Sequence, residues 1–335
     1  MKKNSRKKIE EALVAQQAAQ LEPIEGLVLN WQEDETLYSL LARNHQVRGA
    51  MSPEDTIKMF FGSASGGSLH EDHSEIDIFV VRTQGSLGTA EQILEEHTLF
   101  RFFRMFMNSN QLKQVESGRR SAKKMLNFPL ALPIGGFRNV HPLKGCPACC
   151  NEDMATTGMP YWRLRHQYLG VWVCFEHNRP LQLTTQVPTV PRGFHWVTPD
   201  SHSFAPIHNH LADPESFEKF KWMGEFVLSL IADFDAGTDR VEFERRRLNS
   251  YARDYGLLTP NGRLRSYRTA GVYKLITSFS QFAETYRSCR EFDRLPTESE
   301  LIYPFLSRYL NCQSQLRPSE LLVLTAWVVS FFANA

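Results

Sequence analysis

The spacing of apolar residues predicts two short helices in the first part of the chain. Apolar positions at residues 37–41 follow a helical period, and Asp34 or Thr36 precedes them as a capping residue. Residues 52–54 predict a second helix, because a capping serine, a proline and an acid suit a helix N-terminus. Two helices joined by a turn with Gly49 indicate a helix-turn-helix, and a simple αα-hairpin fits the periodicity equally well.

The apolar pattern of residues 76–124 is clear in one place and ambiguous in two. Thr89 precedes apolar residues at helical spacing that continue to Phe106, and we assign the phenylalanines of this run to the core. Residues 76–81 are apolar but too few to distinguish a strand from a buried helix. Residues 113–124 contain five basic residues and one acid, which fits either a solvated face or a phosphate-facing patch.

The second half of the chain has a predominantly helical pattern. Residues 186–214 are rich in proline, histidine and serine, and they predict a linker. The predicted helices after it include residues 223–234, 241–255, 268–286 and 318–333. Tyr255-Gly256 has the form of a helix end, and Asn261-Gly262 has the form of a turn.

The composition narrows the class of protein without identifying it. The 335 residues are 42% hydrophobic and 22% charged, with a formal net charge of +1, which is typical of a globular protein. No apolar core follows the basic residues at 1–8, so we expect no secretory signal. The apolar run at 321–332 is too short to span a bilayer. Six cysteines favour metal binding in a reducing compartment, which we expect to be a bacterial cytoplasm.

Two short pairs of soft ligands lie in the middle of the chain. Cys146 and Cys149 form one two-spaced pair, and Cys174 and His177 form the second, three residues apart as well. Thiolate and imidazole ligands in such pairs match a tetrahedral structural Zn²⁺ site. Because four protein ligands leave no open coordination position for a catalytic water, we expect the metal to be structural.

Other cysteines and histidines fit a metal site less well. Cys150 in place of Cys149 gives a three-spaced pair, which suits the turn less well. We interpret His166 as a hydrogen-bonded structural histidine. His208 and His210 have no cysteine or carboxylate at suitable spacing, so we do not expect a second metal there.

Arginines are concentrated in the C-terminal half. Residues 238–290 hold eleven Lys or Arg and five Asp or Glu. A helix, a glycine-bearing turn and a second helix with arginines at its entrance are what docking in a DNA major groove requires. The candidate DNA contacts are Arg245, Arg246, Arg247, Arg263, Arg265 and Arg268. The alternative is a solvated helix face with internal ion pairs, and the salt dependence of DNA binding distinguishes the two.

The sequence carries none of the common catalytic signatures. It has no HExxH motif, no GxxxxGK[ST] phosphate loop and no GxSxG nucleophile elbow. No spacing of its carboxylates indicates the converging acids that a two-metal nuclease needs. We therefore expect a protein that is not an enzyme.

Four segments resemble the TniQ/TnsD family, the target-site selectors of heteromeric (TnsABC-type) DNA transposons. They are DETLYSLLAR at 34–43, TAEQILEEHTLFRFFRMF at 89–106, CPACCNEDMATTGMPYWRLRHQYLGVWVCFEHNRPL at 146–181 and ERRRLNSYARDYGLLTPNGRLRS at 244–266. In the third segment both metal pairs, Tyr161-Trp162 and His166-Gln167 match the family. The histidine-rich stretch after it does not reproduce the second cluster of zinc ligands that some members carry.

The resemblance implies a non-catalytic role in choosing where a transposon inserts. Such proteins recognise the site on double-stranded DNA, or are carried to it by a CRISPR effector complex, and they then recruit an AAA+ ATPase that activates the transposase. One alternative is therefore an adaptor that bridges a CRISPR RNA-guided complex to the ATPase. A second alternative is a zinc-stabilised transcription regulator that binds DNA without transposition partners.

We expect a mainly α, multi-module protein that is nucleoid-associated and has no membrane partner. Its modules are an N-terminal helix-turn-helix, a central zinc-ribbon-like module and a C-terminal helical domain with a basic helix-turn-helix-like segment. The predicted boundaries are 1–25 for a basic flexible leader, 26–125 for the N-terminal domain, 126–190 for the zinc module, 191–213 for a linker and 214–335 for the DNA-binding domain.

Overall fold

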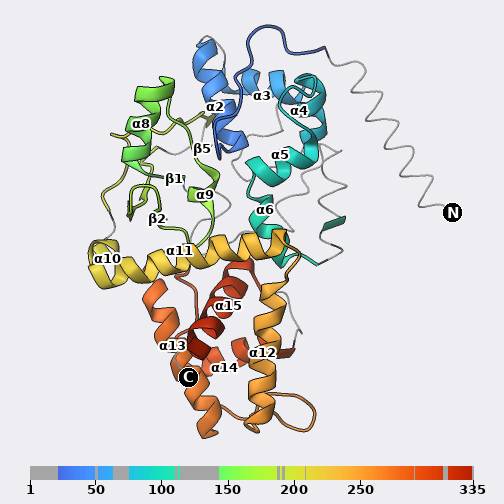
Figure 1. Ribbon diagram of the computed structural model, residues 1–335, viewed down its shortest axis with the longest axis vertical. Helices are drawn as coiled ribbons and strands as arrows, with labels where there is room; N and C mark the ends of the chain where they lie inside the picture. The colour runs from blue at the N-terminus through green and yellow to red at the C-terminus, as the bar shows by residue number, and fades with distance from the viewer. Residues whose placement is uncertain are drawn as a thin grey trace, which may run out of the picture. The chain divides into compact units, whose positions relative to one another are not determined.

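The computed structural model confirms a mainly helical protein with short two-stranded sheets (Figure 1). It describes residues 22–49, 52–62, 75–108, 110, 112–113, 143–186, 189–190, 193–207, 209–289, 291–311 and 316–333. The described residues form two compact units: unit 1 comprises those between 22 and 113, 143–168 and 174–207, and unit 2 comprises 169–173 and 209–333. Most of the predicted leader, the segment 63–68 and nearly all of the basic stretch at 113–124 lie outside the described residues.

The described residues before position 208 form short helices and two-residue strands. The helices are α2 (Leu37–Arg48), α3 (Pro53–Phe61), α4 (Ile76–Arg82), α5 (Ala90–His97), α6 (Phe100–Phe103), the 3₁₀ helix η1 (Arg104–Phe106), α8 (Pro147–Thr157) and α9 (Leu164–Gln167). The strands are β1 (Lys144–Gly145), β2 (Val173–Cys174), β3 (Arg179–Pro180), β4 (Gln182–Leu183), β5 (Thr189–Val190) and β6 (Gly193–Phe194). Strand β1 pairs with β4, β2 with β3, and β5 with β6.

Capping side chains begin the first helices close to where the sequence predicts. Thr36, rather than Asp34, caps α2, because its hydroxyl accepts a hydrogen bond from the third amide of the helix at 3.1 Å. Ser52 begins α3 and Thr89 begins α5, each with a reciprocal capping box. These bonds satisfy amides that a helix leaves without partners, so a few polar residues determine where each helix starts.

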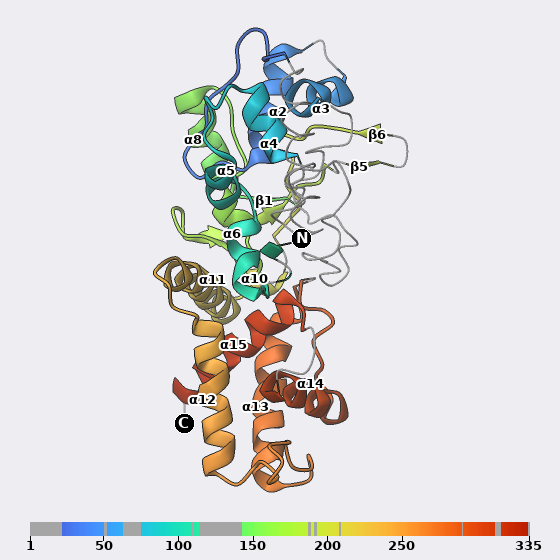
Figure 2. The same ribbon diagram turned by 90° about the vertical axis from the view of Figure 1, so that its right-hand side faces the viewer.

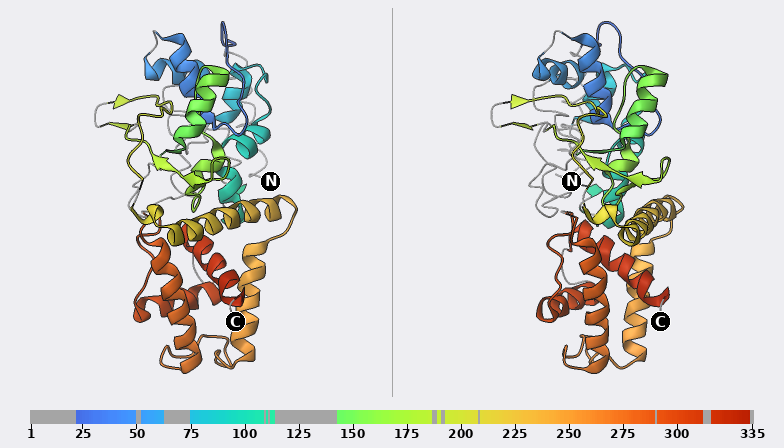
Figure 3. Two further views of the ribbon diagram at one scale, coloured as in Figure 1. Left: turned by 60° about the vertical axis from the view of Figure 1, so that its left-hand side comes forward. Right: turned by 90° about the vertical axis from the view of Figure 1, so that its left-hand side faces the viewer.

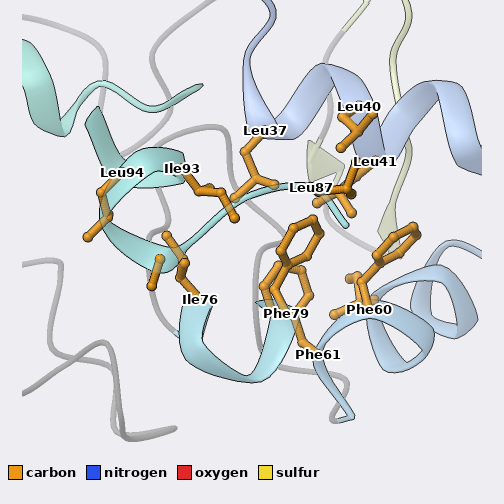
Figure 4. Close-up of a cluster of buried hydrophobic side chains, with 12 residues drawn as sticks. Leu37, Leu40, Leu41, Phe60, Phe61, Ile76, Phe79, Leu87, Ile93 and Leu94 are labelled. Atoms are coloured by element: carbon orange, nitrogen blue, oxygen red, sulfur yellow. The ribbon is translucent and has the colours of Figure 1, made fainter. Parts of the chain in front are cut away.

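Helices α2, α3, α4 and α5 pack around one apolar core (Figure 4). Its buried side chains are Leu37, Leu40, Leu41, Ile57, Phe60, Phe61, Ile76, Phe79, Leu87, Ala90, Ile93 and Leu94. The ambiguous residues 76–81 are helical, since Ile76 and Phe79 lie one turn apart and are both fully buried. The consecutive helices α2 and α3 are present as predicted, and their use as a helix-turn-helix stays a prediction.

Unit 2 is built from long helices. They are α11 (Pro214–Asp235), α12 (Arg240–Asp254), α13 (Ala270–Tyr286), α14 (Ser299–Asn311) and α15 (Pro318–Ala333), and the short α10 (Asn209–Ala212) precedes them. Helix α15 packs against both α12 and α13, and Figure 3 shows these three helices together. The apolar run at 321–332 is thus a buried helix, as predicted. None of the helices in the described ranges has both the length and the apolar character that a membrane crossing requires.

A short segment from the middle of the chain folds as part of unit 2. The Gly170 amide and the Trp172 Nε1–H both donate to Oε2 of the buried Glu291 at 3.0 Å. Gly170 has a φ of +80°, and a Cβ at this position would meet Met223 and Val227 at 3.2 Å. Residue 170 must therefore be a glycine for both backbone conformation and space.

Replacing Glu291 by alanine is expected to destabilise unit 2 by about 2–5 kcal/mol, because two buried donors lose their acceptor. Glu291→Gln is the matched control, since its carbonyl oxygen still accepts a hydrogen bond, and it should cost clearly less. Urea unfolding of the full chain, followed by the helical circular dichroism signal, measures both. Equal losses for the two variants would contradict this role for the carboxylate.

Candidate metal centre

Two turns bring the four predicted ligands together. Cys146 follows β1 and occupies the N-cap position of α8, and Cys149 lies in the first turn of that helix. Cys174 ends β2, and His177 follows in the connection to β3. Each pair therefore lies where a strand gives way to a helix or turn, so that two side chains point to the same side.

The four ligand atoms all lie within 4.8 Å of one another. The Sγ of Cys149 is 3.6 Å from the Sγ of Cys174 and 3.3 Å from the Nδ1 of His177. Nδ1 of His177 is also 3.5 Å from Cys174 Sγ and 3.8 Å from Cys146 Sγ. Ligands of one tetrahedral Zn²⁺ at about 2.3 Å are separated by about 3.8 Å, so this donor set fits that ion.

Neighbouring groups adjust the protonation and orientation of these ligands. Hydrogen bonds from the thiols of Cys149 and Cys174 lower the pKa of Cys146, which favours a thiolate. The Nε2 of His177 lies 2.9 Å from Oε1 of Glu152, and this bond raises the pKa of the imidazole. A carboxylate on Nε2 fixes the ring so that Nδ1 faces the sulfurs, which is the usual support for a metal-binding histidine.

Two other candidates lie outside this cluster. Cys150 is buried, but its sulfur is not among the four clustered ligand atoms, so Cys149 is the partner of Cys146. His166 is buried as well, and burial lowers its pKa to about 3. Its Nε2 has no hydrogen-bond partner among the described residues, so the interpretation of His166 as a hydrogen-bonded histidine is wrong at this atom. His208 and the side chain of His210 lie outside the described residues, so the proposed absence of a second metal there is not tested.

A buried ion pair lies beside the cluster. Two guanidinium nitrogens of Arg163 donate to the two carboxylate oxygens of Asp153 at 2.8 Å each, and both side chains are buried. The Nε of Arg163 also lies 3.7 Å from Glu176, which in addition accepts from Arg165 at 3.1 Å and from the thiol of Cys149 at 3.5 Å. Because Asp153 belongs to α8 and Arg163 precedes α9, this pair holds the helix that carries the first ligand pair.

The first and third family-like segments are in direct contact in unit 1. The Thr36 amide donates to the Trp162 carbonyl at 3.0 Å, and the Leu164 amide donates to the Asp34 carbonyl. Arg165 lies 131 residues from Asp34 in the sequence, yet its Nε donates to Oδ2 of that residue at 2.8 Å. Hydrogen bonds thus join residues 34–43 to the residues that follow α8, and each of the two segments donates at least one of them.

The second family-like segment joins the same region through His97. Its Nδ1 lies 2.7 Å from the Glu35 carbonyl oxygen, and its ring stacks on Trp31 with centroids 3.5 Å apart. Glu35 is fully buried and forms an ion pair with Arg43 at 2.7 Å. The one signal of this arrangement in the sequence is that polar residues recur within otherwise apolar segments.

Arg245, Arg246 and Arg247 each pair with a glutamate of their own helix, α12. Arg245 and Arg246 both donate to Glu242, with Nε to carboxylate distances of 2.7 and 2.6 Å. Arg247 donates to the buried Glu244 at 3.4 Å and lies over the ring of Phe332, 4.1 Å from its centroid. These contacts favour the alternative of an ion-paired helix face for the three residues.

The other three candidate arginines lie in the connection between α12 and α13. This connection is not a short turn: residues 257–265 form a small β-hairpin with a bridge between Leu258 and Leu264. Arg263 and Arg265 lie on its second arm, and Arg268 lies between the hairpin and α13. All three side chains are exposed.

Comparison with known protein families gives one match. Residues 27–181 match the family model TniQ. This range contains the three segments that meet in unit 1 and all four residues of the metal cluster, whereas the fourth family-like segment lies outside it. No curated protein matches the chain.

Proposed function

We infer from the match over residues 27–181 that the chain is a TniQ-family protein, and we propose that it is a non-catalytic target-site selector of DNA transposition. In this role it binds target DNA and recruits the AAA+ regulator of the transposon. The observation that carries the proposal is the convergence of three family-like segments beside the Cys146, Cys149, Cys174 and His177 cluster. A protein with this role is expected in the bacterial cytoplasm, associated with the nucleoid.

The metal centre supports a structural role. We propose that Cys146, Cys149, Cys174 and His177 hold one Zn²⁺, which would join the start of α8 to the β2–β3 connection. With four protein donors the ion has no free position for a substrate or a catalytic water. The nearby carboxylates also support a structural role for the metal, because Asp153 is hydrogen-bonded to Arg163 and Glu152 to His177.

Purified protein is expected to bind double-stranded DNA with an affinity that falls steeply with salt, because phosphate contacts release counterions. In the presence of the AAA+ ATPase, it should retain that ATPase on DNA that contains the insertion site. Fluorescence anisotropy with labelled target and random DNA, across a salt series and with and without the ATPase, measures both steps.

Preference for target over random DNA identifies a direct reader of the site. Salt-sensitive binding without preference, together with ATPase recruitment, favours an adaptor that depends on another complex, such as a CRISPR effector, for its sequence information. DNA binding without any ATPase recruitment contradicts the proposed function and favours a transcription regulator.

A further inference from the structure

The connection between α12 and α13 presents an unusually basic surface, which we call the arginine tip. Figure 2 shows this connection at the end of the α12–α13 pair. The tip is defined by the exposed residues Arg253, Tyr255, Arg263, Arg265, Arg268, Tyr273 and Lys274. No Asp or Glu occurs anywhere between residues 255 and 283. The exposed Asp254 is the one acid among residues 253–274, against five Lys or Arg, so the tip keeps a net positive charge.

Ion pairing distinguishes the arginine tip from the neighbouring arginines of α12. Among the described residues, the five basic side chains of the tip form no ion pair, whereas Arg245, Arg246 and Arg247 are each paired with a glutamate. A paired arginine must break its existing contact before it binds phosphate, and that contact offsets part of the gain. Within the described ranges the tip arginines have no ion pair to break: the side chain of Arg265 donates only from its Nε to the Leu258 carbonyl at 3.2 Å, and Arg268 lies over the ring of Tyr267.

The hairpin holds its arginines in a defined geometry. The Thr259 amide donates to the Arg263 carbonyl at 2.7 Å, and the Arg265 amide donates to the Leu257 carbonyl at 2.8 Å. Leu264 is buried between the two arginines, so the alternation of an extended strand directs Arg263 and Arg265 to the opposite, exposed face. Their Cα atoms are about 6.8 Å apart by strand geometry. The two side chains are therefore presented together on a preformed element.

The chemistry of the arginine tip fits nucleic acid better than an acidic protein. Stable protein interfaces have an apolar centre, and the large exposed apolar side chains of the described tip are limited to Tyr255 and Tyr273, at 68% and 55% exposure. Both carry a hydroxyl that donates to phosphate as well as to solvent. Arginine forks bind phosphate with two parallel hydrogen bonds, and several of them along one edge suit a polyanion.

We propose that the arginine tip binds the sugar–phosphate backbone of double-stranded DNA and that Arg245, Arg246 and Arg247 stabilise α12 instead. This inference rests on the proposed function, in which the chain binds target DNA, and it assigns the contact to one surface. Because the contacts are to phosphate, they contribute affinity and orientation on any sequence. Sequence preference, where the protein has one, comes from other residues.

Two matched double variants of the full chain test this assignment. Arg263→Gln/Arg265→Gln removes two charges from the tip, and Arg246→Gln/Arg247→Gln removes two charges from exposed positions of α12. The probe is a labelled double-stranded DNA of random sequence, titrated from low to moderate salt. The tip variant is expected to bind about tenfold more weakly and to lower the slope of log K against log salt by about 2. The α12 variant is expected to retain the slope of the native protein.

Circular dichroism and thermal unfolding establish that both variants are folded, and Arg268→Gln/Lys274→Gln gives a second tip variant that leaves the hairpin intact. Equal losses for the tip and α12 variants, or a native protein that does not bind DNA at low salt, overturn the proposal. Recruitment of the AAA+ ATPase by the native protein in the same samples reports separately on the proposed function. Loss of that recruitment with unchanged DNA affinity in the tip variants makes the tip a protein-binding surface and also overturns the proposal.

Discussion

Replacing Cys149 by serine is expected to abolish metal binding and to unfold the region around α8. Cys149 Sγ contacts both Cys174 and His177 within 3.6 Å, so it lies at the centre of the ligand set. Structural Zn²⁺ contributes about 10–16 kcal/mol to folding in small zinc modules at neutral pH. The zinc content should fall from about one equivalent per chain to nearly none, and the melting temperature should fall by at least about 10 °C. Atomic emission and near-UV circular dichroism measure these changes.

The neighbouring cysteine provides the control for this experiment. Cys150 is buried next to Cys149 on α8, but its sulfur is not part of the ligand cluster. Cys150→Ala should therefore keep the full zinc content and cost about 1 kcal/mol through lost packing. A chelator added to the native protein should reproduce the Cys149→Ser result. Full zinc content in Cys149→Ser, or equal loss in both variants, is incompatible with the proposed ligand set.

Local sequence signals predicted the helix starts well, and they selected four candidate ligands whose donor atoms the structure places within 4.8 Å of one another. The caps at Ser52 and Thr89 depend on residues three positions away, and the ligand pairs depend on spacings of three residues. Such interactions are decided within one turn, so the sequence is sufficient to predict them. The choice of Cys149 over Cys150 rested on the two-residue spacing of the pair, and the structure groups the sulfur of Cys149 with the other three ligand atoms.

Contacts between distant segments could not be predicted in the same way. The bond between Asp34 and Arg165 joins residues 131 positions apart, and no periodicity of either segment indicates the other. The arginines of α12 show a related problem. A run of three arginines indicates a basic surface, but Glu242 and Glu244 lie one turn earlier and accept most of their hydrogen bonds. Net charge along the chain does not reveal such pairing.

The sequence predicted the turn between α12 and α13 correctly, but it did not predict the β-hairpin that contains this turn. The turn at Asn261-Gly262 is present, with Gly262 at a φ of +74°. The sequence did not reveal that Leu257 and Leu264 are buried and draw the flanking residues into a hairpin. Because these two leucines are buried in unit 2, the connection is an ordered β-hairpin and not only a short turn.

Removing the Asp153 carboxylate is expected to be the most damaging substitution outside the ligand set. Asp153→Ala leaves the buried guanidinium of Arg163 with only the distant carboxylate of Glu176, at 3.7 Å. An uncompensated buried charge costs about 3–5 kcal/mol, which lowers the melting temperature by roughly 6–15 °C for a unit of this size. The cost should appear as a lower thermal midpoint, with zinc still bound at low temperature.

A double-mutant cycle separates the ion pair from general effects of substitution. Arg163→Met alone should also destabilise, because it leaves the Asp153 carboxylate buried without its partner. The double variant Asp153→Ala/Arg163→Met should cost at least about 1–2 kcal/mol less than the two single variants together, since neither charge remains. Glu215→Ala, which breaks the exposed pair with Lys219 on α11, is the control and should cost below about 1 kcal/mol. Additive effects in the cycle would show that Arg163 and Asp153 act independently, and the connection between α8 and the residues before α9 would then need a different explanation.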